Sequence, residues 1–184
     1  MLSRLKAIFA REAAAPECFS GLGVVLLSGP CSARLDGPPL SPADLLGVMN
    51  EVLSFQTDLI LRFDGVVDKC VGDCVIAYWP PRAMPRAVCA AKAAASELVK
   101  KKGIDRVSFE MRVSFAAAEF AVAAFGPPGR KQFQAIGRAC TRANSMRSRL
   151  RGGGVITDAE TFKILPPEEQ AGFVLQDGYL WRTE

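Results

Sequence analysis

The stretch Gly65-Val-Val-Asp-Lys-Cys-Val-Gly-Asp-Cys-Val-Ile-Ala-Tyr-Trp79 contains two short apolar runs that meet at Gly72-Asp73. A glycine–aspartate pair between two such runs is typical of a tight β-hairpin. Side chains alternate between the two faces of a strand, so Asp68 and Lys69 are expected on opposite faces. The sequence therefore predicts a hairpin that carries the Asp73 carboxylate at its tip, with Lys69 a few residues back.

Both polar side chains of this hairpin suit the binding of a ligand. A carboxylate at a turn can hold a hard cation such as Mg²⁺, which prefers oxygen ligands. A lysine on a strand can present three N–H donors to a ligand. The alternative interpretation is an ordinary hairpin with polar residues at its tip. The choice between these interpretations depends on the residues around the hairpin.

Two segments carry a family resemblance. They are Leu-Ser-Pro-Ala-Asp-Leu-Leu-Gly-Val-Met-Asn-Glu-Val-Leu at 40–53 and Ile-Leu-Arg-Phe-Asp-Gly-Val-Val-Asp-Lys-Cys-Val-Gly-Asp at 60–73. Together they resemble the class III nucleotide cyclase catalytic domain, the adenylate/guanylate cyclase family, in which a helix and a tight turn precede an Asp-Lys-x-x-Gly-Asp hairpin. Weaker similarity extends to about Leu165. The resemblance implies an α+β, ferredoxin-like cyclase-homology fold with a mostly antiparallel sheet flanked by helices.

The resemblance also implies roles for individual residues. Cyclases of this family hold two divalent metal ions with two aspartates, and Asp73 matches the aspartate of the hairpin. The other metal position falls at about Ser28, whose hydroxyl brings no charge to offset a divalent ion. Lys69 matches the lysine that reads the purine base. Gln134 occupies the second base-reading position, where an amide can both donate and accept.

A later segment departs from the family pattern at three positions. The residues at 133–145, Phe-Gln-Ala-Ile-Gly-Arg-Ala-Cys-Thr-Arg-Ala-Asn-Ser, lie where the family shows Tyr-Thr-Val-Ile-Gly-Asp-Ala-Val-Asn-x-Ala-x-Arg. Arg138 replaces an aspartate, Thr141 replaces the asparagine and Ser145 replaces the arginine, the last two of which serve the ribose and the transition state. Loss of such a charged group commonly lowers a rate by orders of magnitude.

These matches and losses predict a cyclase-like domain that is catalytically impaired or inactive, a pseudocyclase acting in signalling by dimerisation, nucleotide sensing or partner docking. The alternative is an active adenylate cyclase that converts ATP to cyclic AMP and pyrophosphate with a rearranged metal site. We expect Mg or Mn as a cofactor if ATP or GTP is bound, and otherwise none. The resemblance implies a homodimer, or a heterodimer with another cyclase-like chain.

A basic run extends from Arg130 to Arg151 without an acidic residue. Within it, Arg138 and Arg142 are four residues apart on a predicted helix, where like charges repel mildly unless an anion joins them. One interpretation is an anion-binding surface for a phosphate or an acidic partner, and the other is a solvated basic face. Nucleic acid is not an expected partner, because aromatic residues for base stacking do not interleave with the arginines and the net charge of +4 is modest.

The composition fits one globular domain. The chain has 184 residues, of which 49% are hydrophobic and 23% charged, as expected for a chain that buries a core. No uncharged apolar run is long enough to span a bilayer, so no transmembrane segment is expected. Residues 1–18 are interpreted as an amphipathic helix or arm that packs on the domain, on a second copy or on a membrane surface. Residues 19–184 are interpreted as a single cyclase-homology domain.

The six cysteines indicate a reducing environment. No two of them form a C-x-x-C pair and the chain has no histidine, so a structural zinc site is not expected. Most of them lie among apolar residues and are interpreted as small hydrophobic residues of a cytoplasmic protein. The absence of histidine also excludes serine–histidine and cysteine–histidine hydrolases.

The rest of the sequence predicts alternating strands and helices. A loop rich in Gly, Pro and Ser is expected over 29–42. Strands are expected over 21–27, 109–115, 119–125, 133–136 and 155–157, helices over 42–63, 86–102, 138–150 and 158–165, and a closing strand or hairpin over 173–181.

Overall fold

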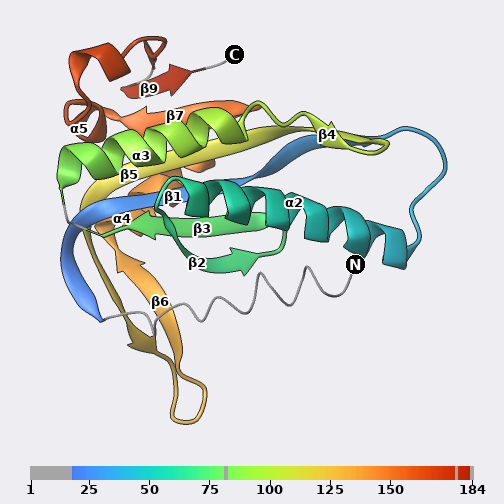
Figure 1. Cartoon of the computed structure of the whole chain (residues 1–184), viewed down its shortest axis with the longest axis horizontal. Helices are drawn as coiled ribbons and strands as arrows, with labels where there is room; N and C mark the ends of the chain where they lie inside the picture. The colour runs from blue at the N-terminus through green and yellow to red at the C-terminus, as the bar shows by residue number, and fades with distance from the viewer. Residues whose placement is uncertain (1–17, 81–82, 177, 183–184) are drawn as a thin grey trace.

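The computed structural model describes residues 18–80, 83–176 and 178–182. Figure 1 shows one open sheet with helices on both faces. The strands are β1 (Phe19–Leu35), β2 (Val66–Val71), β3 (Cys74–Trp79), β4 (Gly103–Ile104), β5 (Val107–Phe125), β6 (Gln132–Gly137), β7 (Gly154–Asp158), β8 (Val174–Gln176) and β9 (Tyr179–Arg182). The helices are α2 (Pro42–Arg62), α3 (Met84–Leu98), α4 (Arg138–Arg147) and α5 (Ala159–Phe162), with a short 3-10 turn η1 (Pro167–Glu169).

Two long strands organise the sheet. The strand order is β2-β3-β1-β5-β7-β9-β8, and β4 and β6 pair with the two ends of β5. Every pairing in this described sheet is antiparallel except that of β5 with β7. The expected fold class, α+β with a mostly antiparallel sheet flanked by helices, is confirmed.

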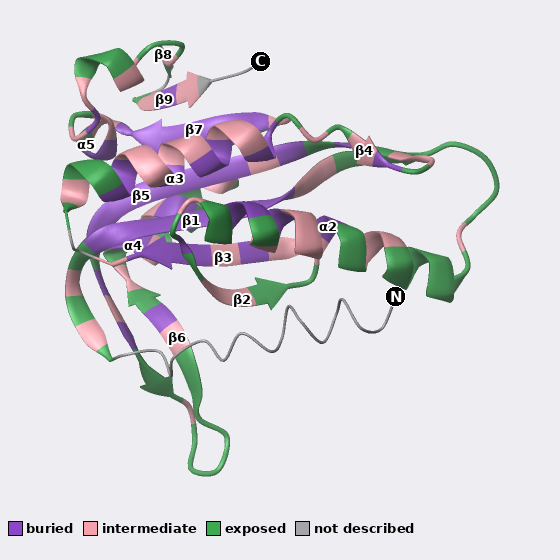
Figure 2. Ribbon diagram, in the orientation of Figure 1, coloured by how far each residue is buried: buried purple, intermediate pink, exposed green. Residues whose placement is uncertain are grey.

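Two apolar clusters of buried residues pack on the sheet. In Figure 2 much of the central strands and part of α3 are purple, that is, buried. The helices α2 and α3 cover one face, where Ile60 and Leu98 are fully buried against the strands. The helix α4 covers the other face, with Met146 in its last turn and Leu150 just beyond its end both buried. Burying each such side chain contributes about 1.5–3 kcal/mol, so both helix layers hold the sheet in place.

The predicted hairpin is confirmed. Val71 pairs directly with Cys74, which leaves Gly72 and Asp73 as a two-residue turn. Gly72 has a φ of +61°, a conformation that glycine adopts without steric cost. The turn therefore places the Asp73 side chain at the end of the hairpin, as the sequence predicted.

The helix α2 also begins where the sequence predicted. Ser41 precedes it with extended backbone, and its Oγ accepts a hydrogen bond from the Asp44 N–H (3.2 Å). Pro42 follows as the first helical residue, where a missing N–H costs nothing. The start of α2 fixes which of its side chains point at the sheet, and this matters for the site.

The predictions for the two long strands were wrong. β1 continues through Ser-Gly-Pro-Cys at 28–31 to Leu35, where a loop was expected, and β5 is one strand where two were expected. β1 extends because Gly29 and Pro30 pair with Arg112 and Met111 of β5. Pairing with a neighbour outweighs weak local strand propensity. Three helices are also shorter than expected, since α3 ends at Leu98, α4 at Arg147 and α5 at Phe162.

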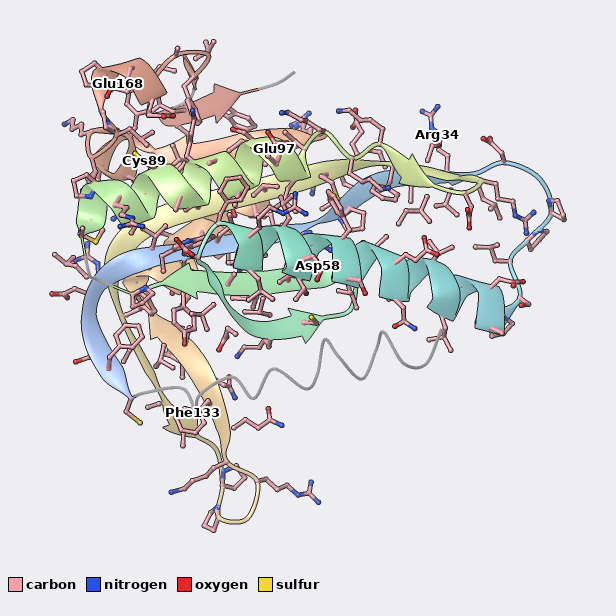
Figure 3. The ribbon with its side chains drawn as sticks, in the orientation of Figure 1. Arg34, Asp58, Cys89, Glu97, Phe133 and Glu168 are labelled. Atoms are coloured by element: carbon pink, nitrogen blue, oxygen red, sulfur yellow. The ribbon has the colours of Figure 1, made fainter. Side chains whose placement is uncertain are left out.

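The end of β5 and β6 form a hairpin that extends away from the body of the domain (Figure 1). We call residues 120–137 the arm. Three large apolar side chains of the arm are exposed, namely Phe125 (60%), Phe133 (39%) and Ile136 (47%). Figure 3 labels Phe133 on this hairpin, well away from the helices. By register, Phe125 and Ile136 lie on one face of the arm and Phe133 on the other, so the described chain leaves apolar side chains uncovered on both faces.

The described residues contain no helix long and apolar enough to cross a membrane. The predicted N-terminal helix or arm, residues 1–18, lies outside the described residues except for Cys18, which is exposed.

Candidate functional site

The predicted base-reading residues Lys69 and Gln134 lie together with Asp68, which was not a predicted site residue, where β2 lies against β6. We call these three residues the lysine corner. The Lys69 ammonium pairs with the Asp68 carboxylate (Nζ to Oδ2 3.2 Å). Strand alternation predicted these two side chains on opposite faces of β2, but the register of β2 shifts between Val67 and Lys69. Lys69 Nζ also donates to Gln134 Oε1 (2.8 Å), and the Ala135 N–H donates to Asp68 Oδ1 (2.9 Å). The structure thus brings together the two residues predicted to read a base.

Asp68 anchors the lysine corner from inside the protein. Its side chain is 3% exposed, whereas that of Lys69 is 30% exposed. Burial, reinforced by the Asp68 charge, raises the pKa of the Cys140 thiol to about 11 and also raises the pKa of Tyr78. A buried carboxylate holds a partly exposed ammonium in a defined position. Lys69 can therefore exchange its contact with Gln134 for a ligand without leaving Asp68.

The second group, which we call the serine corner, lies at the tip of the β2–β3 hairpin. It consists of Ser28, Gln56, Asp73, Cys74 and Arg147. Ser28 is fully buried, and its Oγ donates to Gln56 Oε1 (2.6 Å). Gln56 Nε2 in turn donates to the backbone carbonyl of Asp73 (2.9 Å). One amide therefore ties β1, α2 and the hairpin turn together at the predicted metal position.

Sequence reasoning missed Gln56. The residue lies on the buried stripe of α2 with Val52, Leu59 and Ile60. A glutamine on the apolar face of a helix is the signal that was available, because a buried amide must find hydrogen-bond partners. Its partner Ser28 could not be identified from sequence, since it lies on a different element.

Arg147, the last residue of α4, reaches the serine corner from the opposite face of the sheet. Its Nη2 donates to Cys74 Sγ (2.9 Å), and the Cys74 thiol donates to Asp73 Oδ1 (3.2 Å). Burial and the Asp73 hydrogen bond raise the pKa of Cys74 to about 11, against the opposing effect of Arg147. A Cβ on Gly29 would lie 2.6 Å from both Arg147 Nη2 and Cys74 Sγ, so this glycine leaves the room that the guanidinium occupies. Sequence reasoning counted Arg147 only within the basic run.

The serine corner does not fit the magnesium or manganese ions that the resemblance implies. Hard divalent ions need several oxygen ligands, usually with carboxylate charge. Here Asp73 supplies one carboxylate, and the Ser28 hydroxyl directs its hydrogen to Gln56. The Arg147 guanidinium shares the Cys74 sulfur with Asp73 and repels a second cation. No group of three or more His, Cys, Asp or Glu side chains suited to a metal occurs among the described residues.

Two of the three substituted positions on α4, Thr141 and Ser145, lie in a separate cavity. Thr141 and Ser145 are both exposed and line a hollow of about 470 Å³ together with Glu160 of α5 and Tyr179 of β9. Thr141 Oγ1 donates to the Gly137 carbonyl (3.3 Å), one turn back on its own helix. Neither side chain contacts the lysine corner or the serine corner through a hydrogen bond in the described chain. Within one chain, the predicted transition-state positions therefore line a hollow whose described lining includes no residue of either corner.

Arg138 and Arg142 do not share a free basic surface. The Arg142 guanidinium pairs with Asp158 (Nη2 to Oδ2 2.8 Å) and with Glu160 (Nη1 to Oε2 2.7 Å). Arg138 is exposed and lines a different hollow with Glu119. The intramolecular pairs of Arg142 argue against the joint anion-binding role that spacing suggested, because its charge is already balanced.

The comparisons with known proteins concern the fold. No protein-family model matches the sequence, and no curated protein matches it. Among solved structures, the chain is similar to the adenylyl cyclase CyaB from P. aeruginosa, with 18% identity, a TM-score of 0.68, and 90% of this chain and 97% of that one covered. It is also similar to the catalytic core of a rhodopsin–guanylyl cyclase with converted specificity in complex with ATPαS (15%, TM-score 0.73, 92% and 100% covered).

A third similar structure is the guanylate cyclase domain of RhGC from Catenaria anguillulae in complex with GTP (15%, TM-score 0.71, 89% and 95% covered). The alignments therefore include almost all of each solved domain. The described part of this chain thus has the fold of the class III adenylyl and guanylyl cyclase catalytic domain.

Proposed function

We propose that this chain is a cyclase-like signalling domain that makes little or no cyclic nucleotide and acts through nucleotide sensing and contact with a second chain. The observation that carries the proposal is the buried hydrogen bond from Ser28 to Gln56 at the position of a metal aspartate. Cyclase chemistry is an in-line displacement whose attacking and leaving oxygens need charge stabilisation. The serine corner supplies a single carboxylate beside a guanidinium, which is poorly matched to that need.

The substitutions on α4 support the same proposal. Thr141 and Ser145 carry no charge, and the nearby Arg142 is paired with two carboxylates. Electrostatic stabilisation of the transition state usually contributes most to catalysis, and one missing donor alone costs roughly a hundredfold in rate. We therefore expect turnover far below that of a cyclase with the complete set of residues.

The lysine corner supports nucleotide sensing. Lys69 and Gln134 lie within hydrogen-bond distance of each other, and the lysine is partly exposed. Solved domains of the same fold are in complex with ATPαS and with GTP. We place the purine edge of ATP or GTP between these two side chains, where the amide and the ammonium exchange their mutual contact for contacts with the base.

The arm supports contact with a second chain. Its exposed Phe125 and Ile136 share one face of the hairpin by register, with Phe133 on the other face, and exposed apolar side chains of this kind are what interfaces cover. We assign a second copy, or a related cyclase-like chain, to this surface. Light scattering should report a dimer that Phe125→Glu weakens. The same change at Val174, which is exposed on β8 away from the arm, should leave the dimer intact.

The cysteines support a reducing compartment such as the cytoplasm. All six are free thiols, and disulfides persist mainly outside the cytosol. We include a cytoplasmic location in the proposal.

Calorimetry with ATP and GTP, combined with an assay for cyclic product on the same sample, tests the proposal. We expect nucleotide binding without cyclic product in the presence of manganese. Lys69→Met should weaken nucleotide binding, whereas Lys163→Met, the same change at an exposed lysine on a distant surface, should not. Failure of both nucleotides to bind would remove nucleotide sensing and leave only the contact with a second chain.

Cyclic product would favour the alternative, an active adenylate cyclase. In that case Asp73→Ala should abolish turnover, because Asp73 is the carboxylate of the serine corner, while Asp58→Ala on the exposed side of α2 should not. Robust turnover that depends on Asp73 would show the pseudocyclase proposal to be wrong.

A further inference from the structure

The serine corner contains a guanidinium with unused hydrogen-bond donors. Arg147 donates once, to the Cys74 sulfur, and its Nε is buried without a partner. None of the ion pairs among the described residues includes Arg147. A guanidinium carries five N–H donors, and a thiol sulfur is a weak acceptor. The remaining donors and the charge therefore suit an oxyanion.

The surroundings of Arg147 compensate its charge only in part. The Asp73 carboxylate contacts the same Cys74 sulfur but forms no ion pair with Arg147. The negative end of the α4 dipole offsets only part of a full charge. Gly29 presents no side chain toward Arg147 Nη2, so only its backbone lies beside the guanidinium.

We infer that the serine corner binds a phosphoryl oxyanion directly on Arg147 without a metal ion. Its charge preference is thus the reverse of the cation site that the cyclase resemblance implies. The planar guanidinium fork matches two oxygens of a phosphate, which a hydrated ammonium would not do as well. The inference deepens the proposed function and rests on it, because direct binding of phosphate to Arg147 requires that no divalent ion is held there.

The effect of Asp73 on phosphate affinity distinguishes direct binding from binding through a metal ion. The Asp73 carboxylate lies on the other side of the Cys74 sulfur and repels an incoming phosphate. If a metal ion bridged Asp73 to the phosphate, loss of the carboxylate would abolish binding. If Arg147 binds the phosphate directly, loss of the carboxylate strengthens binding. The isosteric variant Asp73→Asn separates the two arrangements.

The experiment is calorimetry of the full chain with sodium pyrophosphate and with ATP, both in excess EDTA. We expect binding in EDTA that Arg147→Met weakens by about ten- to a hundredfold, as for loss of a charge-assisted hydrogen bond. Arg151→Met, the same change at an exposed arginine four residues further on, should have little effect. Asp73→Asn should bind more tightly than the wild type. Thermal unfolding of each variant reports whether it folds, and Asp73→Asn keeps the test decisive if Arg147→Met does not fold.

Three outcomes would overturn the inference: binding that requires magnesium or manganese, binding that survives Arg147→Met, or binding that Asp73→Asn abolishes. Equal affinity for pyrophosphate and ATP would identify the oxyanion alone as the ligand. ATP binding without pyrophosphate binding, still dependent on Arg147, would identify a nucleotide. Cyclic product measured in the same samples with manganese tests the proposed function separately, so failure of the inference can be told from failure of the proposed function.

Discussion

The two corners of the β2–β3 hairpin differ in how their polar groups are used. In the lysine corner, Lys69 is partly exposed and meets Gln134 through a contact that a ligand can replace. In the serine corner, Ser28 and Gln56 are fully buried and bonded to each other. The first corner keeps side chains that suit recognition of a base. The second has turned a predicted ligand position into part of the packed interior.

The comparison of the two corners indicates that a hairpin of this geometry can form whether or not its tip carries a complete metal site. The turn depends on Gly72 and on the register of β2 with β3, which are local properties. A metal site depends on carboxylates from separate strands, and a single serine on β1 removes one of them. The amide of Gln56 then satisfies the polar groups that a buried site would otherwise leave without partners.

The largest expected effect is the loss of the buried amide. Gln56→Leu leaves the Ser28 hydroxyl and the Asp73 carbonyl without their partner and should lower the free energy of unfolding by about 3 kcal/mol. The matched change Gln134→Leu, in the more open lysine corner, should cost less than about 1 kcal/mol. Urea unfolding measures both. Equal costs would remove the distinction between the buried amide of Gln56 and the more accessible amide of Gln134.

The next effect concerns the helix that carries Arg147 into the serine corner. Arg142→Ala leaves the Asp158 carboxylate, which is only 12% exposed, without its cation and should destabilise the domain by about 2 kcal/mol. Arg138→Ala, at an exposed arginine of the same helix, should change stability by no more than about 0.5 kcal/mol. Urea unfolding of the two variants gives the comparison. A similar small effect from both would mean that the ion pairs of Arg142 do not fix α4.

A smaller effect tests the Ser28 hydroxyl itself. Ser28→Ala removes one donor to Gln56 and should cost about 1 kcal/mol of unfolding free energy. The same change at Ser20, which is exposed on β1, should cost almost nothing. In the double variant with Gln56→Leu, the two costs should sum to more than the measured loss, because both remove one interaction. Strict additivity would contradict the hydrogen bond.

The smallest effect is a dependence of stability on pH. The Cys74 thiol has its pKa raised from 9.0 to about 11, so the unfolded chain releases this proton first as the pH increases. The contribution of the protonated Cys74 thiol to the free energy of unfolding is fully present below about pH 9 and is lost as the pH rises toward 11. Stability measured by urea unfolding should therefore fall across this range. The fall should be smaller in Cys74→Ala and unchanged in Cys18→Ala, and an unchanged fall in Cys74→Ala would contradict the burial of this thiol.

Several features could be predicted because they are local. The Gly72-Asp73 turn and the start of α2 at Ser41 follow from turn chemistry and capping. Alternation failed at Asp68 and Lys69, where the register of β2 shifts. The strand ends could not be predicted in the same way. β1 continues through Gly29 and Pro30 because β5 pairs with it, and neither residue favours a strand.

Sequence alone was enough to predict the hairpin, the fold class and the residue type at each predicted site position, including the serine where the resemblance implies a carboxylate. The role of that serine depends on how the chain packs. The partners of Ser28 and Cys74 are Gln56 and Arg147, which lie on helices that cover opposite faces of the sheet. Hydrogen bonds between distant elements depend on packing, and no local pattern records them.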